Sequence, residues 1–171
     1  MRKSLCKCVS FFILTTVLLW LPLPKITANV TLPKIFTDNM VLQRDVKVPV
    51  WGWADKGEKV TVTFAGNKYT AIPDANGKLV INLAPLPAGG PYEMVIKGKN
   101  QLTLKDILMG EVWLCSGQSN MEMPLEGWGK INNYQKEIAD ANYPTIRLFT
   151  VPKKIGAKPI KEMDNGKWEV C

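Results

Sequence analysis

The residues best suited to chemistry lie in one block, Val112-Trp113-Leu114-Cys115-Ser116-Gly117-Gln118-Ser119-Asn120-Met121-Glu122-Met123-Pro124. Its apolar start, residues 112–115, stops abruptly at small and polar residues, which is typical of a short buried strand. Gly117 permits a tight turn, so Ser119 is expected at the carboxyl end of that strand, where open α/β sheets bind ligands. A serine on such a turn is a candidate nucleophile, and neighbouring backbone N–H groups are candidate oxyanion donors.

The short pattern Gly-x-Ser-Asn is not specific by itself. It differs from the Gly-x-Ser-x-Gly elbow of α/β hydrolases, because Met121 stands in place of the second glycine. The longer block resembles the first conserved block of the sialate O-acetylesterases, which belong to the SGNH (GDSL-like) hydrolases. Residues 36–44 resemble the amino-terminal part of the same family. The resemblance implies that Ser119 is the nucleophile and that its own N–H helps to hold the oxyanion.

The resemblance also implies roles for the neighbours of Ser119. Gly117 would permit the turn, and Asn120 would belong with Gly117 and Ser119 to the oxyanion loop. Gln118 and Glu122 are candidate substrate-binding residues. For Asn120 and Glu122 a structural role is favoured over substrate contact, because polar loop side chains commonly bond to local backbone. Glu122 is not assigned as a general base, since no predicted position brings it to Ser119.

The chain contains no histidine, although a serine hydroxyl needs a base to take its proton. In the SGNH family that base comes from an Asp-x-x-His motif near the far end of the catalytic domain. A glycine and an asparagine from intermediate blocks add oxyanion donors. None of these motifs is found in the sequence. We therefore expect an amino-terminal fragment of a longer enzyme, with little or no esterase activity alone. No metal or organic cofactor is implied.

Residues 1–28 have the order of a secretory signal peptide. A basic start is followed by an apolar run over residues 11–21, and cleavage is expected after Ala28. The run is too short for a membrane-spanning anchor, which needs about 20 apolar residues. The sequence therefore predicts export to the periplasm or the extracellular space, without a stable membrane anchor.

Removal of this leader lowers the net charge. The whole chain has 22 basic and 15 acidic residues, and residues 1–28 hold four of the bases and no acid. The mature part therefore carries 18 bases against 15 acids, a net charge of +3. So small a charge, with its lysines scattered along the chain, does not indicate a nucleic-acid partner.

Two cysteines lie in the leader, which leaves Cys115 and Cys171 in the mature part. An exported protein permits a disulfide between them, but a buried free thiol at Cys115 is equally natural. The sequence leaves the pairing open. Spacing such as Cys-x-x-Cys, which is typical of metal sites, is absent after residue 28.

Residues 29–106 are predicted to form a small antiparallel β-sandwich, because short alternating segments are separated by turn signals at close spacing. The clearest strand is residues 59–64, where apolar residues alternate with threonines. Asn76-Gly77 is a strong hairpin signal. The other expected strands cover residues 47–53, 68–72, 78–83, 92–97 and 101–108.

Residues 107–171 show a different pattern. The continuous apolar run at 112–115 suits a strand covered on both faces. Residues 131–141 repeat apolar side chains at helical spacing, with Asn132 or Asn133 as the cap, and residues 146–151 are predicted to form a second strand. Strand, helix and strand make a βαβ unit with a parallel sheet. The expected fold class is therefore α+β in several parts, a sandwich followed by the truncated start of an α/β SGNH-hydrolase domain. The end of the chain is expected to be loop-like.

Three functions fit these observations. The first, implied by the resemblance, is a carbohydrate esterase that removes O-acetyl groups from sialic acids through a serine acyl-enzyme. The second is an acetylesterase for other glycans, such as acetylated xylan, since related SGNH families share the Gly-Gln-Ser-Asn-Met block. The third is a non-enzymatic carbohydrate-binding module. Trp51 and Trp53 share one strand face and could stack on sugar rings, although core aromatics are the favoured interpretation. The expected ligand is an O-acetylated sialic acid or a related acetylated sugar.

Overall fold

A computed structural model describes residues 29–129, 131–158 and 163–171. The predicted signal peptide lies outside these residues. Nine strands, one 3₁₀ helix and one α-helix are formed in the part of the chain that the structure describes. In chain order they are β1 (Val41–Gln43), β2 (Val48–Trp53), β3 (Val60–Phe64), β4 (Asn67–Ala71), β5 (Lys78–Leu83), β6 (Gly89–Lys97), β7 (Gln101–Gly110), η1 (Ser119–Glu122), α2 (Tyr134–Asp140), β8 (Arg147–Phe149) and β9 (Trp168–Val170).

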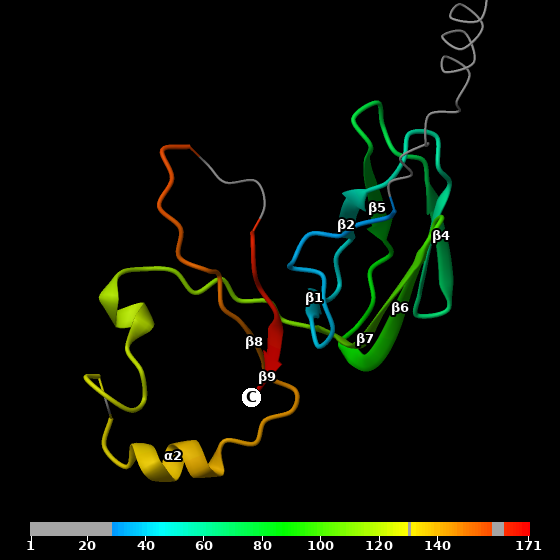
Figure 1. Cartoon of the computed structure of the whole chain (residues 1–171). Coiled ribbons are helices and arrows are strands. Elements are labelled where there is room, and N and C mark those ends of the chain that lie inside the picture. Colours follow the sequence, from blue (N-terminus) through cyan, green and yellow to red (C-terminus); the bar gives the residue numbers. More distant parts are fainter. Residues whose placement is uncertain (1–28, 130, 159–162) are drawn as a thin grey trace, which may run out of the picture.

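The first seven strands form a sheet-rich body, residues 29–110, built from two sheets (Figure 1). One sheet has the order β1-β7-β6-β3-β4, and the other pairs β2 with β5. All neighbours are antiparallel except β1 and β7, where Val41 pairs with Leu108 in a parallel ladder. The larger sheet is therefore mixed, whereas the sequence predicted antiparallel pairing throughout.

Strict alternation explains how the body closes. In β3 the residues Val60, Val62 and Phe64 are buried, and in β5 the same is true of Leu79, Ile81 and Leu83. Successive side chains of a strand point to opposite faces, so these two sets can face one another across the sheets. Together with residues from β2, β6 and β7 they form one hydrophobic cluster. The predicted strands of this region are confirmed within a few residues of their expected ends.

One predicted hairpin is wrong. Asn76-Gly77 does form a tight turn, in which the Asp74 side chain accepts hydrogen bonds from the N–H groups of Asn76 (2.8 Å) and Lys78 (2.9 Å). However, the strands on either side do not pair with each other, because β4 pairs with β3 and β5 pairs with β2. The turn therefore carries the chain from one sheet to the other. Turn residues specify the reversal, but the hydrophobic face decides which strand becomes the partner.

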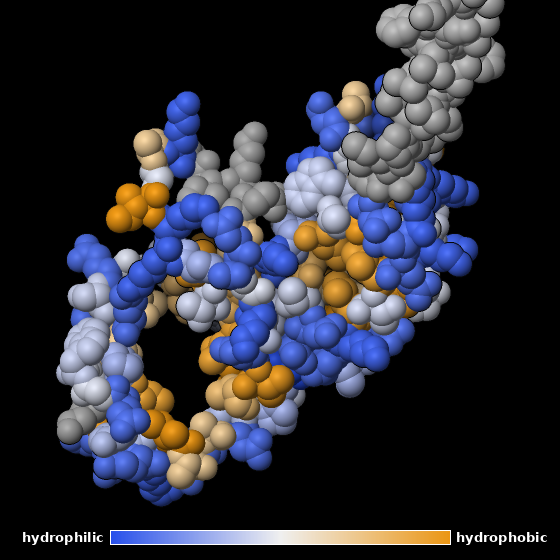
Figure 2. Space-filling model, in the orientation of Figure 1, coloured by the Kyte–Doolittle hydropathy of each residue, from blue (hydrophilic) through white to orange (hydrophobic). Residues whose placement is uncertain are grey.

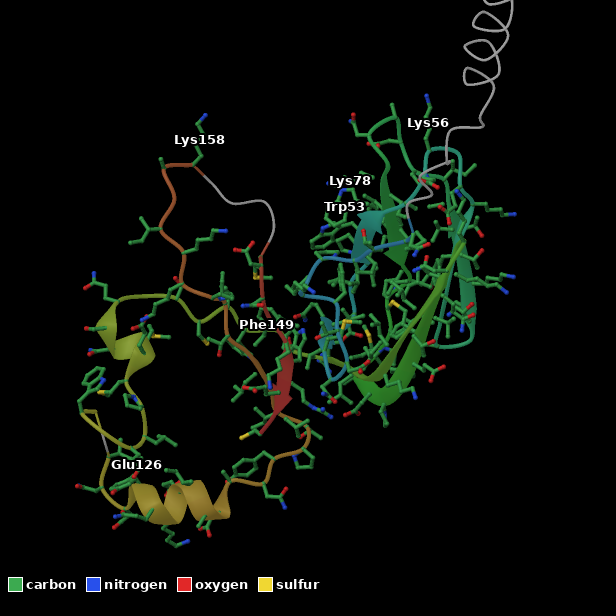
Figure 3. The ribbon with its side chains drawn as sticks, viewed as in Figure 1. Trp53, Lys56, Lys78, Glu126, Phe149 and Lys158 are labelled. Atoms are coloured by element: carbon green, nitrogen blue, oxygen red, sulfur yellow. The ribbon has the colours of Figure 1, made fainter. Side chains whose placement is uncertain are left out.

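Trp51 and Trp53 lie on the face of β2 opposite to Val48 and Val50, and both are half-buried. Trp51 packs edge-on against Phe36, with ring centroids 4.8 Å apart. The favoured prediction of a packed aromatic is therefore confirmed for Trp51. Trp53 lies at the end of β2 beside Lys78 of β5 (Figure 3).

Residues 111–171 form an excursion that leaves the body after β7, turns through η1 and α2, and returns beside β1 as the β8–β9 hairpin (Figure 1). In Figure 2 the excursion surrounds an open gap. Every buried hydrophobic residue of the described chain belongs to the body, and the excursion exposes many large apolar side chains. The described residues of the excursion form no hydrophobic core of their own.

The predicted strand at residues 112–115 is not formed. Trp113 and Leu114 are 83% and 90% exposed. A strand needs a neighbour for its backbone groups and a cover for its apolar side chains, and the described chain offers this segment neither. The predicted parallel βαβ unit is therefore wrong too. The strand β8 pairs instead with β9, antiparallel, with Leu148 opposite Glu169. The sequence interpretation missed β9.

The predicted helix is present as α2 but is shorter than residues 131–141, and none of its residues is buried. Asn133 occupies the cap position with a left-handed backbone (φ 61°). Its side chain makes no capping hydrogen bond, whereas its carbonyl accepts from the N–H groups of Lys136 and Glu137. No helix in the described ranges has the length and hydrophobicity needed to cross a membrane.

Candidate active site

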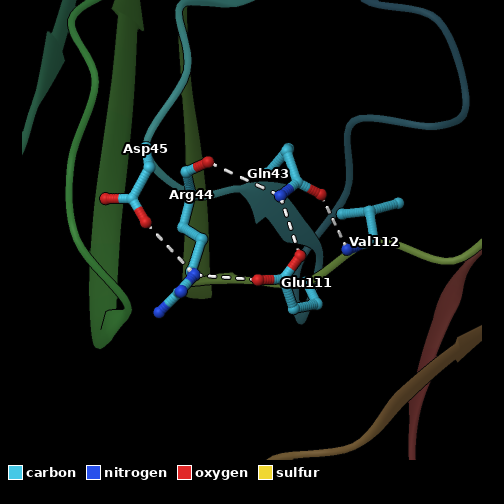
Figure 4. Close-up of polar contacts among 5 residues, drawn as sticks. All are labelled: Gln43, Arg44, Asp45, Glu111 and Val112. Carbon is cyan, nitrogen blue, oxygen red and sulfur yellow. Dashed lines mark hydrogen bonds and ion pairs between the residues drawn. The ribbon is translucent and has the colours of Figure 1, made fainter.

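The serine block begins at a polar junction on the body (Figure 4). Gln43, the last residue of β1, accepts a hydrogen bond from the Val112 N–H through its Oε1 (2.9 Å). Its Nε2 donates to Glu111 Oε2 (3.1 Å). The other carboxylate oxygen of Glu111 lies 2.9 Å from Arg44 Nε. Because the parallel β1–β7 ladder ends at Gln43 and Gly110, these side chains meet where the chain leaves the sheet.

The charge on Glu111 is favoured by this junction. The pKa of Glu111 is lowered, chiefly by the Gln43 amide, which donates to the carboxylate. Desolvation opposes this shift, and the charge and hydrogen bond of Arg44 lower the pKa further. Glu111 is therefore ionised at neutral pH and links the first residue of the excursion to Gln43 of β1 and to Arg44 just after it.

Ser119 lies eight residues after Glu111, as the first residue of the 3₁₀ helix η1. Gln118 before it is extended (φ −108°, ψ −154°), and its carbonyl accepts from the Met121 N–H at 2.9 Å. Ser119 is exposed. The structure thus confirms a turn that presents Ser119 to solvent, although the residues before it are not a strand.

Gly117 allows this turn to fold tightly. A Cβ atom at this position would lie 2.6 Å from the Met121 side chain, so any other residue would displace Met121. The glycine is therefore explained by close approach rather than by an unusual backbone angle. The 3₁₀ turn brings residues 117 and 121 together. The sequence predicted a tight turn at Gly117 but not this contact.

The remaining predicted site residues lie on the same turn. Gln118, Asn120 and Glu122 are all exposed. Glu122 pairs with Lys153, with Oε2 and Nζ 2.6 Å apart. This pair connects η1 to the segment after β8. The structural role favoured for Glu122 stays a prediction, because this contact is an ion pair between exposed side chains and not a bond to local backbone.

The described chain answers the question that the sequence left open about its two cysteines. Cys115 and Cys171 are both free thiols, and Cys115 is exposed rather than buried. No group of three or more His, Cys, Asp or Glu residues that could hold a metal ion occurs within the described ranges. A hollow of about 660 Å³ lies in the loop after β8, and none of the predicted site residues lines it.

The sequence interpretation missed the residues that hold the serine segment, residues 112–146, in place. Gln43 and Arg44 anchor its start, and Arg147 anchors its return through an ion pair with Asp106 (2.8 Å). Gln43 and Arg44 lie within residues 36–44, which resemble the esterase family. That resemblance was the only sequence feature that could have pointed to them. Arg147 and Asp106 carry no local signal, because their partnership depends on a contact across 41 positions.

Comparison with known proteins gives several relatives. No family model matches the chain. It is 37% identical over 130 residues to sialate O-acetylesterase of Mus musculus, a match that covers 68% of this chain and 24% of the mouse protein. The enzyme of the same name from Rattus norvegicus is 34% identical over 143 residues, covering 75% and 26%. The human one is 34% identical over 127 residues, covering 67% and 24%. The chain therefore spans about a quarter of the length of these curated relatives.

A solved structure extends the comparison. The crystal structure of a carbohydrate acetylesterase from Xanthomonas citri matches with a TM-score of 0.79 and 37% identity, over 83% of this chain and 32% of the other. Because 83% of 171 residues is about 142, and residues 1–110 supply at most 110 of them, the match extends into the excursion.

The chain is therefore similar, over most of its length, to a carbohydrate acetylesterase of known structure. More particularly, it is a homologue of the sialate O-acetylesterases, which confirms the recognition based on the serine block.

Proposed function

We propose that this chain is the amino-terminal part of an exported carbohydrate esterase that removes O-acetyl groups from sialic acids, with Ser119 as the nucleophile. The observation that carries the proposal is the position of Ser119, exposed at the start of η1 on a segment anchored to the body. The names of the curated relatives support the substrate class. Export to the periplasm or extracellular space is proposed from the order of residues 1–28.

The proposed reaction is an acyl transfer through Ser119. Its Oγ attacks the acetyl carbonyl carbon, and the tetrahedral intermediate collapses to acetyl-serine while the sugar hydroxyl leaves. Water then attacks the acetyl-serine and releases acetate. The Ser119 N–H donates to the oxyanion, and Gly117 and Asn120 shape the loop around it. The proton acceptor is proposed to come from polypeptide beyond these 171 residues, because they contain no histidine.

The fold is consistent with different roles for the body and the excursion. We propose that residues 29–106 are a β-sandwich domain and that residues 107–171 begin an SGNH-type esterase domain. The body contains the whole described hydrophobic cluster, whereas the excursion exposes apolar side chains that further polypeptide would cover. The body acts as the support, and the excursion contributes the nucleophile.

A second candidate keeps the chemistry and changes the sugar. The Xanthomonas citri relative is described as a carbohydrate acetylesterase without reference to sialic acid. We therefore include acetylated glycans such as xylan as alternative substrates. Acetate release from O-acetylated sialic acid and from acetylated xylan, measured side by side, separates the two.

The proposal is tested in a chimera in which residues 29–171 replace the matching segment of a full-length curated relative. The chimera should release acetate, and Ser119→Ala should reduce kcat by on the order of 10⁴-fold or more. Ser116→Ala is the matched control, since Ser116 is an exposed serine of the same loop. A chimera that folds and keeps its turnover after Ser119→Ala refutes the proposal.

The 171-residue chain alone should show little turnover. Fast acetylation of its Ser119 by an aryl acetate would contradict that expectation.

A further inference from the structure

The side chain of Arg147 is buried where the excursion returns to the body. Only 5% of it is exposed, although Arg147 opens the short edge strand β8. Its NH1 donates to Asp106 Oδ2 (2.8 Å) and lies 3.4 Å from Asn39 Oδ1. Its Nε is buried without a hydrogen-bond partner in the described part of the chain. A buried guanidinium with one unsatisfied nitrogen is costly, which makes it a poor choice for stability alone.

The two acceptors are held in place by the body. Asp106 and Asn39 both have left-handed backbones, with φ of 55° and 64°, a conformation that Asn and Asp adopt more readily than other non-glycine residues. Asp106 lies in an irregularity of β7, where the register with β6 shifts between Tyr92 and Met94. Such bulges redirect a side chain out of the regular ladder. The body therefore presents two oxygen acceptors to Arg147.

A second contact reinforces the return of the excursion. Trp168 of β9 donates from its Nε1 to the Ile35 carbonyl (2.9 Å) and packs against the edge of the hydrophobic cluster. Its ring lies 5.3 Å from that of Phe149 in β8, and Figure 3 shows Phe149 on the hairpin beside the body. Both strands of the hairpin are thus attached to the body.

Both ends of the serine segment, residues 112–146, are therefore fixed on one corner of the body. Its start is held by Gln43, through the Val112 N–H, and its end by Arg147. None of the described residues between these anchors is buried. Between its ends, no buried side chain of the described residues fixes the direction of the segment, and the Glu122–Lys153 pair joins exposed side chains. Its direction therefore depends chiefly on its ends.

We propose that Arg147, held by Asp106 and Asn39, is a positioning residue that fixes the serine segment, and with it Ser119, relative to the body. The importance of this role for catalysis rests on the proposed function. The claim that Arg147 fixes the orientation of the segment does not rest on the proposed function, because this orientation can be measured without any esterase activity.

The experiment measures that orientation by pulsed electron paramagnetic resonance on the 171-residue chain. Cys6, Cys8 and Cys171 are replaced by serine, so that Cys115, which is exposed in the serine segment, carries one nitroxide. Thr63→Cys, at an exposed position of β3, carries the other. The compared variants are Arg147→Met, Arg147→Lys and Asp106→Asn. Lys136→Met is the matched control, because it removes an exposed ion pair within α2 and leaves the junction intact.

We expect a single dominant distance in the parent and in Lys136→Met. In Arg147→Met the distribution should become at least about twofold wider, as the segment samples more orientations. Arg147→Lys and Asp106→Asn should lie in between, since each keeps part of the contact. Equal widths in the parent, Arg147→Met and Asp106→Asn overturn the proposal.

Hydrogen exchange separates positioning from a general structural role. In Arg147→Met the amides of β8 and β9 should exchange faster, while those of β3 and β6 keep their protection. Equal acceleration in β3 and β6 overturns the proposal, because Arg147 would then stabilise the body as a whole. If Arg147→Met does not fold, Asp106→Asn decides by the same two measurements. In the chimera, Arg147→Met should lower kcat by about tenfold with little change in KM, because misplacement affects the reacting geometry, and Arg147→Lys should restore part of it.

Discussion

The sheet-rich body and the excursion differ in what holds them. The body buries alternating side chains from both sheets in one cluster, so that its strands are fixed by their own sequence periodicity. The excursion contains all of η1, α2, β8 and β9, yet the described part of it buries none of its large hydrophobic residues. The local sequence pattern therefore predicts the structure correctly where the chain itself supplies the strands that pack against each other. It fails where the predicted strand needs a neighbouring strand that these residues do not provide.

The largest expected contrast is between two truncations of large side chains. Phe64 in β3 is 1% exposed and packs edge-on against Tyr92, with ring centroids 5.5 Å apart. Phe64→Ala should lower the free energy of unfolding by about 3–5 kcal/mol, because it removes apolar contacts and leaves a cavity. Urea unfolding followed by tryptophan fluorescence measures the change.

Leu114→Ala is the matched change in the excursion, where the side chain is 90% exposed. Its effect on the same unfolding transition should stay within about 0.5 kcal/mol. A loss at Leu114 as large as that at Phe64 would break the comparison, since it would mean that the serine segment has a packed environment in solution.

A smaller effect is expected at the turn that joins the two sheets. Asp74→Ala removes the acceptor for the N–H groups of Asn76 and Lys78, and should cost about 1–2 kcal/mol. Asp74→Asn keeps an acceptor oxygen and should cost less. If both variants melt like the parent, the crossing between sheets is held by strand pairing alone, and the turn contributes little.

The smallest effect concerns pH at the junction. The pKa of Glu111 is lowered in the folded chain, chiefly by the Gln43 hydrogen bond. The stabilisation from this link is therefore present above the unfolded pKa and is lost as the pH falls through the lower folded pKa. A carbon-detected NMR titration of the Glu111 carboxyl should show a midpoint below the ordinary value for glutamate.

Gln43→Leu serves as the control for this titration. It removes the amide donor, so the Glu111 midpoint should move back up toward its ordinary value, and Glu111→Gln should abolish the signal. A parent midpoint equal to that of Gln43→Leu would show that the contact in Figure 4 does not persist in solution.

Most of the body could be predicted from the sequence because its strands alternate strictly, as at Val60, Val62 and Phe64. The parallel pairing of β1 with β7 could not, since it joins positions 41 and 108 and no local pattern encodes it. The exposed turn at Ser119 was predictable from small and polar residues. The strand predicted at residues 112–115 is not formed, because four apolar residues form a strand only when a neighbouring strand is present to pair with them. Arg147 was missed because its burial depends on a bulge elsewhere in the chain.

The pairing of Val41 with Leu108 has a consequence for the order of events at the ribosome. Strand β1 is synthesised early but cannot find its only ladder until β7 has emerged, so closure of the larger sheet waits for most of the body to be made. Because residues 112–124 follow directly after β7, the nascent serine block leaves the exit tunnel only after the strands of the body are ready to assemble.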